Sequence, residues 1–160
     1  MGISLRPLLG VVLLVLDVSR LVQLPWVDAG PNLYAAFAAY LSLKSGPLTG
    51  GIWGFGGGLA IGLLEGGSTT GPLCLGGLLA GSLPGMVKHL IFWRHPAGQA
   101  ALGALAGTLY GGVQVVVAAL HGQVSPPVPP LAVRLFADAV LTGAACPLAG
   151  MLVERMERRH

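Results

Sequence analysis

The sequence predicts an all-α integral membrane protein with six transmembrane helices in one compact bundle. Only 9% of the 160 residues are charged, whereas 54% are hydrophobic. The mean hydropathy is +0.77, far above the range of soluble domains. A soluble domain of this size needs a polar exterior, which so few charges cannot supply. The composition therefore favours a single membrane domain, residues 1–160, and leaves no room for a separate soluble catalytic module.

Six apolar segments, bounded by proline, glycine or isolated charges, account for almost the whole chain. The predicted spans are 8–25, 30–43, 47–65, 72–87, 97–120 and 131–153. The first span begins like a signal peptide, but Asp17 and Arg20 follow where a small-residue cleavage site is expected, so we predict a retained helix. The second span is short, which predicts that its ends reach the interface or that the bilayer thins around it. The four prolines of segment 125–130 predict a stiff, extended external connector.

The distribution of charge supports the six-span count and sets the orientation. With alternating topology, seven Lys or Arg residues fall on one side and none on the other. The basic side holds Arg6, Lys44, Lys88, Arg94, Arg155, Arg158 and Arg159, and the opposite side holds Asp28, Glu65 and His121. The positive-inside rule then places both termini in the cytoplasm. The apolar stretch 90–93, between Lys88 and Arg94, predicts a segment along the cytoplasmic surface.

Glycines recur at every fourth position on three of the spans, which places them on one face of each helix. In a bilayer, helices associate by close backbone approach, and small residues permit it. Composition explains part of the register, since 10 of the 22 residues in 46–67 are glycine. The pattern leaves open whether a helix of this chain or another protein fills the groove. The predicted packing or partner-interface residues are Gly46, Gly50, Gly54, Gly58, Gly62 and Gly66, then Gly77, Gly81 and Gly85, and then Gly103, Gly107 and Gly111.

Four ionisable residues lie inside predicted spans: Asp17 and Arg20 in the first, Arg134 and Asp138 in the sixth. Because buried charges usually pair or face a cavity, and these lie at matching depths, we predict that spans one and six are neighbours joined by this cluster. Each pair can instead form along its own helix, at spacings of three and four residues. A functional alternative makes the cluster a substrate or proton site.

The residue patterns of common catalytic sites are missing from the sequence. There is no glycine-rich phosphate loop followed by Lys-Ser/Thr and no Gly-x-Ser-x-Gly. Cys74 and Cys146 lie in apolar segments and are predicted to be core residues. We predict a protein that is not an enzyme, with no metal, cofactor or nucleic-acid partner. The histidines, which match no spacing of zinc ligands, are His89, His95, His121 and His160.

A set of short motifs occurs in a characteristic order along the first half of the chain. They are Gly30-Pro31-Asn32-Leu33, the segment 41–48, Gly54-Phe55-Gly56-Gly57-Gly58-Leu59, Gly62-Leu63-Leu64-Glu65 and the small-residue run 75–81. Over residues 8–90 this order resembles the bacterial rod shape-determining protein MreD family, with its Pro-Asp-Leu entry to span two and its Gly-Phe-x-x-Gly-Leu helix before an acidic residue. Asn32 stands where the family often has Asp, and Glu65 is slightly shifted.

The resemblance implies a multi-pass protein of the bacterial cytoplasmic (inner) membrane with both termini in the cytoplasm. It further implies a non-catalytic scaffold of the cell-elongation complex (elongasome), which organises peptidoglycan synthesis and cell shape. The implied partners are the single-span protein MreC and, through it, the synthase RodA, its penicillin-binding partner and the actin-like MreB.

The alternative is the substrate-binding S component of an energy-coupling-factor vitamin transporter, whose small six-helix bundle the predicted fold also resembles. S components carry small-residue stripes on the first helix. In this chain the stripes lie on spans three to five and span one carries Leu and Val, which favours the scaffold. An outer-facing polar pocket would favour the transporter, and the few candidates for one are Asp17, Arg20, Gln23, Arg134 and Asp138.

Overall fold

The structure is a computed structural model that describes residues 6–19, 30–64, 70–90, 92–120 and 128–157. Within these ranges the regular elements are all helical. Their bounds are α1 (Arg6–Val18), α2 (Leu33–Ser45), α3 (Pro47–Leu64), α4 (Thr70–Val87), the 3₁₀ turn η1 (Lys88–Leu90), α5 (Pro96–Leu120) and α6 (Val128–Glu157). The predicted all-α class is confirmed.

Four of the described helices are long and apolar enough to cross a membrane: α3, α4 continued by η1, α5 and α6. Multiple apolar helices of this length identify a multi-pass membrane protein. Helices α1 and α2 have 13 residues each, a length of about 20 Å at about 1.5 Å per residue. That is shorter than a hydrocarbon core of about 30 Å. Residues 20–25 of the first predicted span lie outside the described residues.

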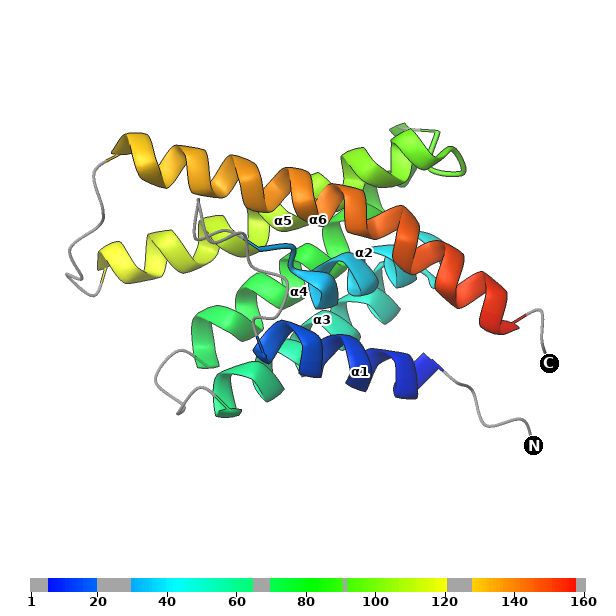
Figure 1. The fold of residues 1–160 in the computed structure, drawn as a ribbon, viewed down its shortest axis with the longest axis horizontal. Helices are drawn as coiled ribbons and strands as arrows, with labels where there is room; N and C mark the ends of the chain where they lie inside the picture. The colour runs from blue at the N-terminus through cyan, green and yellow to red at the C-terminus, as the bar shows by residue number, and fades with distance from the viewer. Residues whose placement is uncertain (1–5, 20–29, 65–69, 91, 121–127, 158–160) are drawn as a thin grey trace.

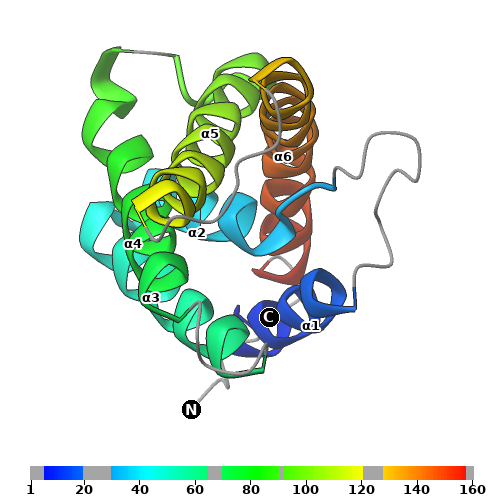
Figure 2. The same cartoon turned by 90° about the vertical axis from the view of Figure 1, so that its left-hand side faces the viewer.

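The helices alternate in direction, so that α1 begins and α6 ends at the same end of the molecule, on the right in Figure 1. Helices α3 and α4 form one closely packed pair, and α5 and α6 form another. Figure 2 shows α2 between these pairs, with α1 along one side. Helix α2 contacts each of the other five α-helices. The bundle is therefore organised around α2.

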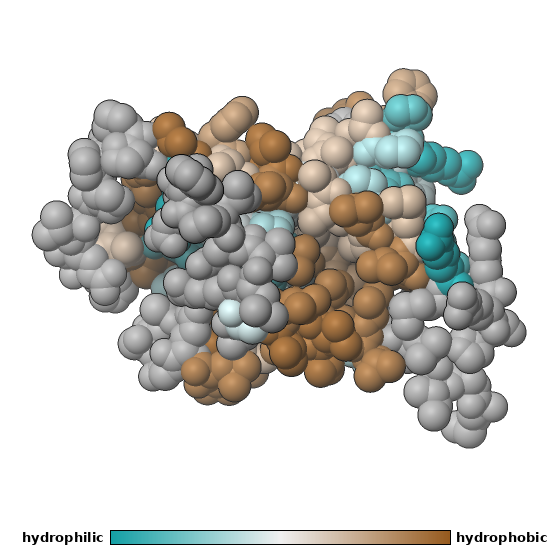
Figure 3. Space-filling model, viewed as in Figure 1, coloured by the Kyte–Doolittle hydropathy of each residue, from teal (hydrophilic) through white to brown (hydrophobic). Residues whose placement is uncertain are grey.

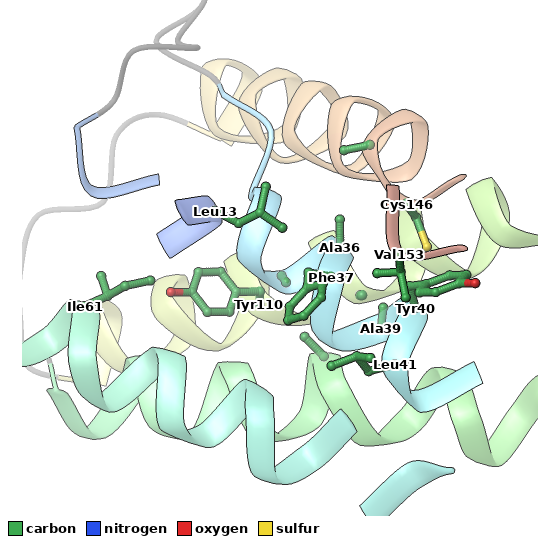
Figure 4. Packing of buried hydrophobic residues seen from close by; sticks show 14 of the residues in the cluster. Leu13, Ala36, Phe37, Ala39, Tyr40, Leu41, Ile61, Tyr110, Cys146 and Val153 are labelled. Atoms are coloured by element: carbon green, nitrogen blue, oxygen red, sulfur yellow. The ribbon is translucent and has the colours of Figure 1, made fainter. Parts of the chain in front are cut away.

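Helix α2 is buried on every side, which distinguishes it from its neighbours. Each residue from Tyr34 to Leu43 is buried. The alanines let neighbouring helices approach closely, while Phe37 and Tyr40 fill the space between them. Figure 4 shows these side chains leaving α2 in different directions. A helix that is apolar all round is a core helix, which explains how so short a segment is accommodated. Around it, other helices contribute Leu13, Ile61, Tyr110, Cys146 and Val153.

The outer helices expose apolar side chains to their surroundings. On α3 these side chains recur at helical spacing along one face, and they are Leu48, Ile52, Phe55, Leu59 and Leu63. Figure 3 shows apolar residues over most of the described surface in that view, with strongly hydrophilic residues at the end where α6 ends. An apolar patch of this extent is unusual on a soluble monomer and is expected of a protein surrounded by lipid.

The prediction of an extended connector over 125–130 is wrong for its last three residues. Helix α6 begins at Val128, so Pro129 and Pro130 lie in its first turn. Proline fits there because the first backbone N–H groups of a helix have no partner within the helix and the fixed φ of proline suits helix initiation. Residues 125–127 lie outside the described residues.

Candidate functional site at the ends of the central helix

The N-terminus of α2 is half-buried in the bundle, and burial is complete from Tyr34 onward, so its first N–H groups need partners within the protein. Asn32 is the N-cap, and its Oδ1 accepts a hydrogen bond from the Ala35 N–H at 2.8 Å. The first helical bond follows, from the Ala36 N–H to the Asn32 carbonyl at 3.0 Å. Asparagine is among the strongest N-cap residues because its short side chain reaches this N–H.

Asp17, in the last turn of α1, satisfies two more N–H groups. Its Oδ1 accepts from the Leu33 N–H at 2.8 Å and its Oδ2 from the Tyr34 N–H at 2.7 Å. Both carboxylate oxygens are therefore used. The carboxylate also stands at the positive end of the α2 dipole, where negative charge is stabilising.

Helix α6 completes this arrangement. Thr142 Oγ1 accepts from the Asn32 N–H at 3.1 Å, and Asp138 Oδ1 accepts from the Gly30 N–H at 3.0 Å. We call Asp17, Asn32, Asp138 and Thr142 the entry cluster. Together its side chains bind every backbone N–H from residue 32 to residue 35, so the half-buried helix start is fully hydrogen-bonded.

The two carboxylates of the predicted charge cluster both lie at the start of α2. Asp17 on α1 and Asp138 on α6 both accept hydrogen bonds from the backbone segment 30–34. Helix α1 packs mainly against α2, with further contacts to α3, so α1 and α6 are linked through the start of α2 rather than side by side. Arg134 is exposed on α6, and Arg20 lies outside the described residues. Thr142 was not among the predicted site residues, although it follows Asp138 by four residues and thus shares its helix face.

The C-terminus of α2 is held by a cation. Lys88, the first residue of η1, donates from Nζ to the Leu43 carbonyl at 3.3 Å. Gly46 is the C-cap, with φ of +107°, and its N–H donates to the Ser42 carbonyl at 3.0 Å. A positive φ disfavours residues with a Cβ, which explains the glycine. With Asp17 at one end and Lys88 at the other, charges complement both ends of the α2 dipole.

The aromatic side chains of α2 tie it to its neighbours. The Tyr34 hydroxyl donates to the Trp53 carbonyl of α3 at 2.8 Å, and the Tyr40 hydroxyl donates to Glu154 of α6 at 3.1 Å. Phe37 packs edge-on against the Trp53 ring, with centroids 5.7 Å apart. These contacts set the rotation of α2 about its axis as well as its position.

The glycine stripe of α3 packs against α4 of the same chain. A Cβ on Gly54 would collide with the Gly77 carbonyl, and one on Gly50 would collide with the Gly81 carbonyl. The backbones therefore touch where each helix has no side chain. Two further contacts of this kind complete the stripe, Gly58 with the backbone of Leu73 and Gly62 with Thr70.

The stripes of α4 and α5 also face helices of this chain. Gly85 packs against Ser42 of α2, whereas Gly103 and Gly107 pack against Thr142 and its neighbours on α6. Other packing glycines lie outside the predicted fourfold series, and several accommodate aromatic side chains, among them Gly10 against Trp53, Gly57 against Tyr34 and Gly150 against Tyr40.

Three of the predicted glycines are not shown in close backbone contact: two from the stripe of span three and one from the series on α5. Gly46 caps α2, as described, and no atom lies within 4 Å of the position of its Cβ, so it is not a packing glycine. Gly66 lies outside the described residues. Gly111 lies close only to the Leu135 side chain, a looser contact than those of Gly103 and Gly107.

The chemistry of this site is backbone recognition. The entry-cluster oxygens accept from main-chain N–H groups, and Cys74 and Cys146 are buried as free thiols. Among the described residues, no three His, Cys, Asp or Glu side chains are grouped so as to hold a metal ion. Comparison with known proteins found no matching family model, no matching curated protein and no matching solved structure.

Proposed function

We propose that this protein is a non-catalytic membrane scaffold of the bacterial cell-elongation machinery, similar to MreD, that binds a single-span partner of the MreC type. In this proposal the chain crosses the cytoplasmic membrane six times, with both termini in the cytoplasm. RodA, its penicillin-binding partner and MreB associate through that partner.

The observation that carries the proposal is that α2 occupies the centre of the bundle. A substrate-binding bundle keeps its polar side chains directed into a space for the substrate. In this chain Asp17, Asn32 and Thr142 bind the backbone of α2 instead. Such a core makes a rigid body, and rigidity is what a scaffold requires of its membrane domain.

The motifs behind the MreD resemblance have structural roles that favour it. Asn32 caps α2, and Asn and Asp are nearly equivalent as N-caps, so the departure from the family's Asp preserves the chemistry. In the Gly-Phe-Gly-Gly-Gly-Leu motif, Gly54 and Gly58 face α4, whereas Phe55 and Leu59 are exposed on the outer surface. One face of this motif builds the fold and the other faces lipid or a partner.

The arrangement of basic residues supports the six-crossing topology. Helices α1 and α2 run antiparallel to each other and are shorter than the other helices (Figure 1). Lys44 lies in the last turn of α2, Lys88 follows α4, Arg94 precedes α5 and Arg155 lies in the last turn of α6. Because successive helices alternate, these four residues lie at one end, which the positive-inside rule assigns to the cytoplasm.

The proposal is tested by co-expressing the protein with the MreC-like protein encoded in the same genome and purifying the tagged chain in mild detergent. A matched control replaces the transmembrane segment of that partner by an unrelated apolar helix. We expect the natural partner to be recovered in stoichiometric amount and the control to be lost. If neither the natural partner nor the control is recovered, and the purified chain carries a bound vitamin or a pair of transporter ATPases, the S-component alternative is established and the scaffold is refuted.

A further inference from the structure

The corner between α4 and α5 (Lys88–Leu90 and 92–95, here called the α4–α5 corner) combines exposed apolar side chains with positive charge. Leu90 is 83% exposed and Phe92 is 91% exposed, the two largest values among the exposed large apolar residues described. Internal packing thus makes almost no use of either. The sequence 88–95 contains two cations and two histidines and no acidic residue.

Two cations of the corner lie beside one indole ring. Lys88 Nζ is 5.9 Å from the centroid of the Trp93 ring, and Arg94 Cζ is 6.0 Å from it. Lys88 is also bound to the Leu43 carbonyl, which holds it in place. The fold therefore positions the charge of Lys88, and Arg94 places a second positive charge beside the same ring.

The backbone of the corner is fixed by contacts with the start of α5. The His95 N–H donates to the Phe92 carbonyl at 3.0 Å, and His95 Nδ1 accepts from the Ala97 N–H at 3.2 Å. Gly98 packs directly against the Phe92 carbonyl, where a Cβ would collide. The exposure of Phe92 is thus built into the turn.

The position of the corner decides which partner it meets. It joins α4 to α5, two helices long and apolar enough to cross a membrane, so it lies where the apolar belt ends. Tryptophan and basic residues are enriched at that level, where apolar rings enter the bilayer and cations meet lipid headgroups. Apolar groups flanked by cations on a rigid turn match an anionic phospholipid in both its parts.

We propose that the α4–α5 corner binds the headgroup of an anionic phospholipid. Lys88 and Arg94 contact the phosphate, and Leu90 and Phe92 enter the adjoining acyl region. This lipid site does not depend on the scaffold proposal, since it follows from the corner alone.

Trp93 provides the probe, since the chain has three tryptophans and the Trp26→Phe, Trp53→Phe variant keeps only this one. The variant is reconstituted into two preparations of phosphatidylcholine vesicles. One contains acyl-brominated phosphatidylglycerol, and the other contains the same mole fraction of acyl-brominated phosphatidylcholine. Bromine quenches only the lipids' near neighbours, so quenching reports local enrichment. We expect about threefold stronger quenching by the anionic lipid.

Arg94→Gln in the same background should lower the quenching by brominated phosphatidylglycerol nearly to that by brominated phosphatidylcholine. Arg155→Gln is the matched control, because Arg155 is another exposed basic residue at this end of the molecule, and it should leave the excess unchanged. Equal quenching by the two lipids, or an equal loss in both variants, overturns the proposal. If the double Trp variant does not fold, the same comparison uses the wild-type signal minus that of Trp93→Phe.

Discussion

The N–H of Tyr34 donates a 2.7 Å hydrogen bond to Oδ2 of Asp17, joining the end of α1 to the buried first turn of α2. The other oxygen of the same carboxylate accepts from Leu33. An intramembrane carboxylate is usually taken as a candidate functional group. In this protein its two oxygens are occupied by main-chain donors, and its charge faces the positive end of a helix dipole. Asp17 is thus a structural residue of the bundle core.

Replacement of Asp17 by Ala should destabilise the protein by about 2–5 kcal/mol, because two buried N–H groups lose their acceptors. Asp17→Asn should cost less, since one amide oxygen remains to accept one of them. Unfolding in detergent, followed by circular dichroism against increasing sodium dodecyl sulfate, measures both. Ser19→Ala, at an exposed position in the turn that follows α1, is the control and should change little. Equal stability of Asp17→Ala and wild type would contradict the assigned role.

Gly54 and Gly56 are two residues apart on α3 yet should respond to alanine in opposite ways. A Cβ at Gly54 meets the Gly77 carbonyl, so Gly54→Ala should force α3 and α4 apart and cost about 1–3 kcal/mol. No atom lies within 4 Å of a Cβ at Gly56, and alanine there should be neutral or stabilise by up to about 1 kcal/mol. Thermal unfolding of the two variants in one detergent checks this. Similar shifts in both would mean that the stripe is not a packing surface.

Thr142→Val should destabilise the protein by about 1–3 kcal/mol, because valine has the same shape but offers no acceptor to the Asn32 N–H. Thr142 is 0% exposed, so no solvent replaces the lost oxygen. The matched control is Thr108→Val on α5, where the hydroxyl is exposed and bonds only within its own helix. The difference between the two variants, measured by the same unfolding titration, isolates the buried contact. A zero difference would show that Thr142 is not needed to anchor α2.

Cysteine labelling should test the six-crossing topology. Cys74 and Cys146 are buried, so the wild-type chain should react poorly with a membrane-impermeant maleimide before denaturation. Ser125→Cys should be labelled in intact cells, because the proposed topology places it outside. His160→Cys should be labelled only after the membrane is permeabilised, because the C-terminus is cytoplasmic. Labelling of both positions from the same side would require an even number of crossings between them, or none, and would contradict the single crossing by α6 in this topology.

Much of the bundle could be predicted because the hydrophobic pattern alone determines it. The predicted spans 47–65, 72–87, 97–120 and 131–153 each coincide closely with a helix. Their apolar windows are long and interrupted by residues that end helices. The first turn of α6 was predicted wrongly, because proline is compatible both with an extended connector and with a helix start. Only the neighbouring packing distinguishes the two.

The candidate site was predicted less completely. The sequence placed Asp17 and Asp138 at similar depths and predicted a cluster with Arg20 and Arg134, but it did not predict that the two carboxylates accept hydrogen bonds from backbone segment 30–34. Their use as acceptors for the α2 backbone depends on the burial of α2, and burial on all sides is a property of the assembled bundle. Thr142 was overlooked for the same reason, since a threonine in an apolar helix most often bonds to its own backbone.

The sequence by itself determined that this is a multi-pass helical membrane protein. It also determined where the helices lie and which of their faces carry small residues that permit close contact. Those properties follow from local composition and from the period of the helix. Only the tertiary structure decided that the stripe from Gly50 to Gly62 is filled by α4 of the same chain, and that the charges near α2 hold a buried helix at both ends. Partner choice of this kind depends on contacts between residues far apart in the chain, which no local pattern encodes.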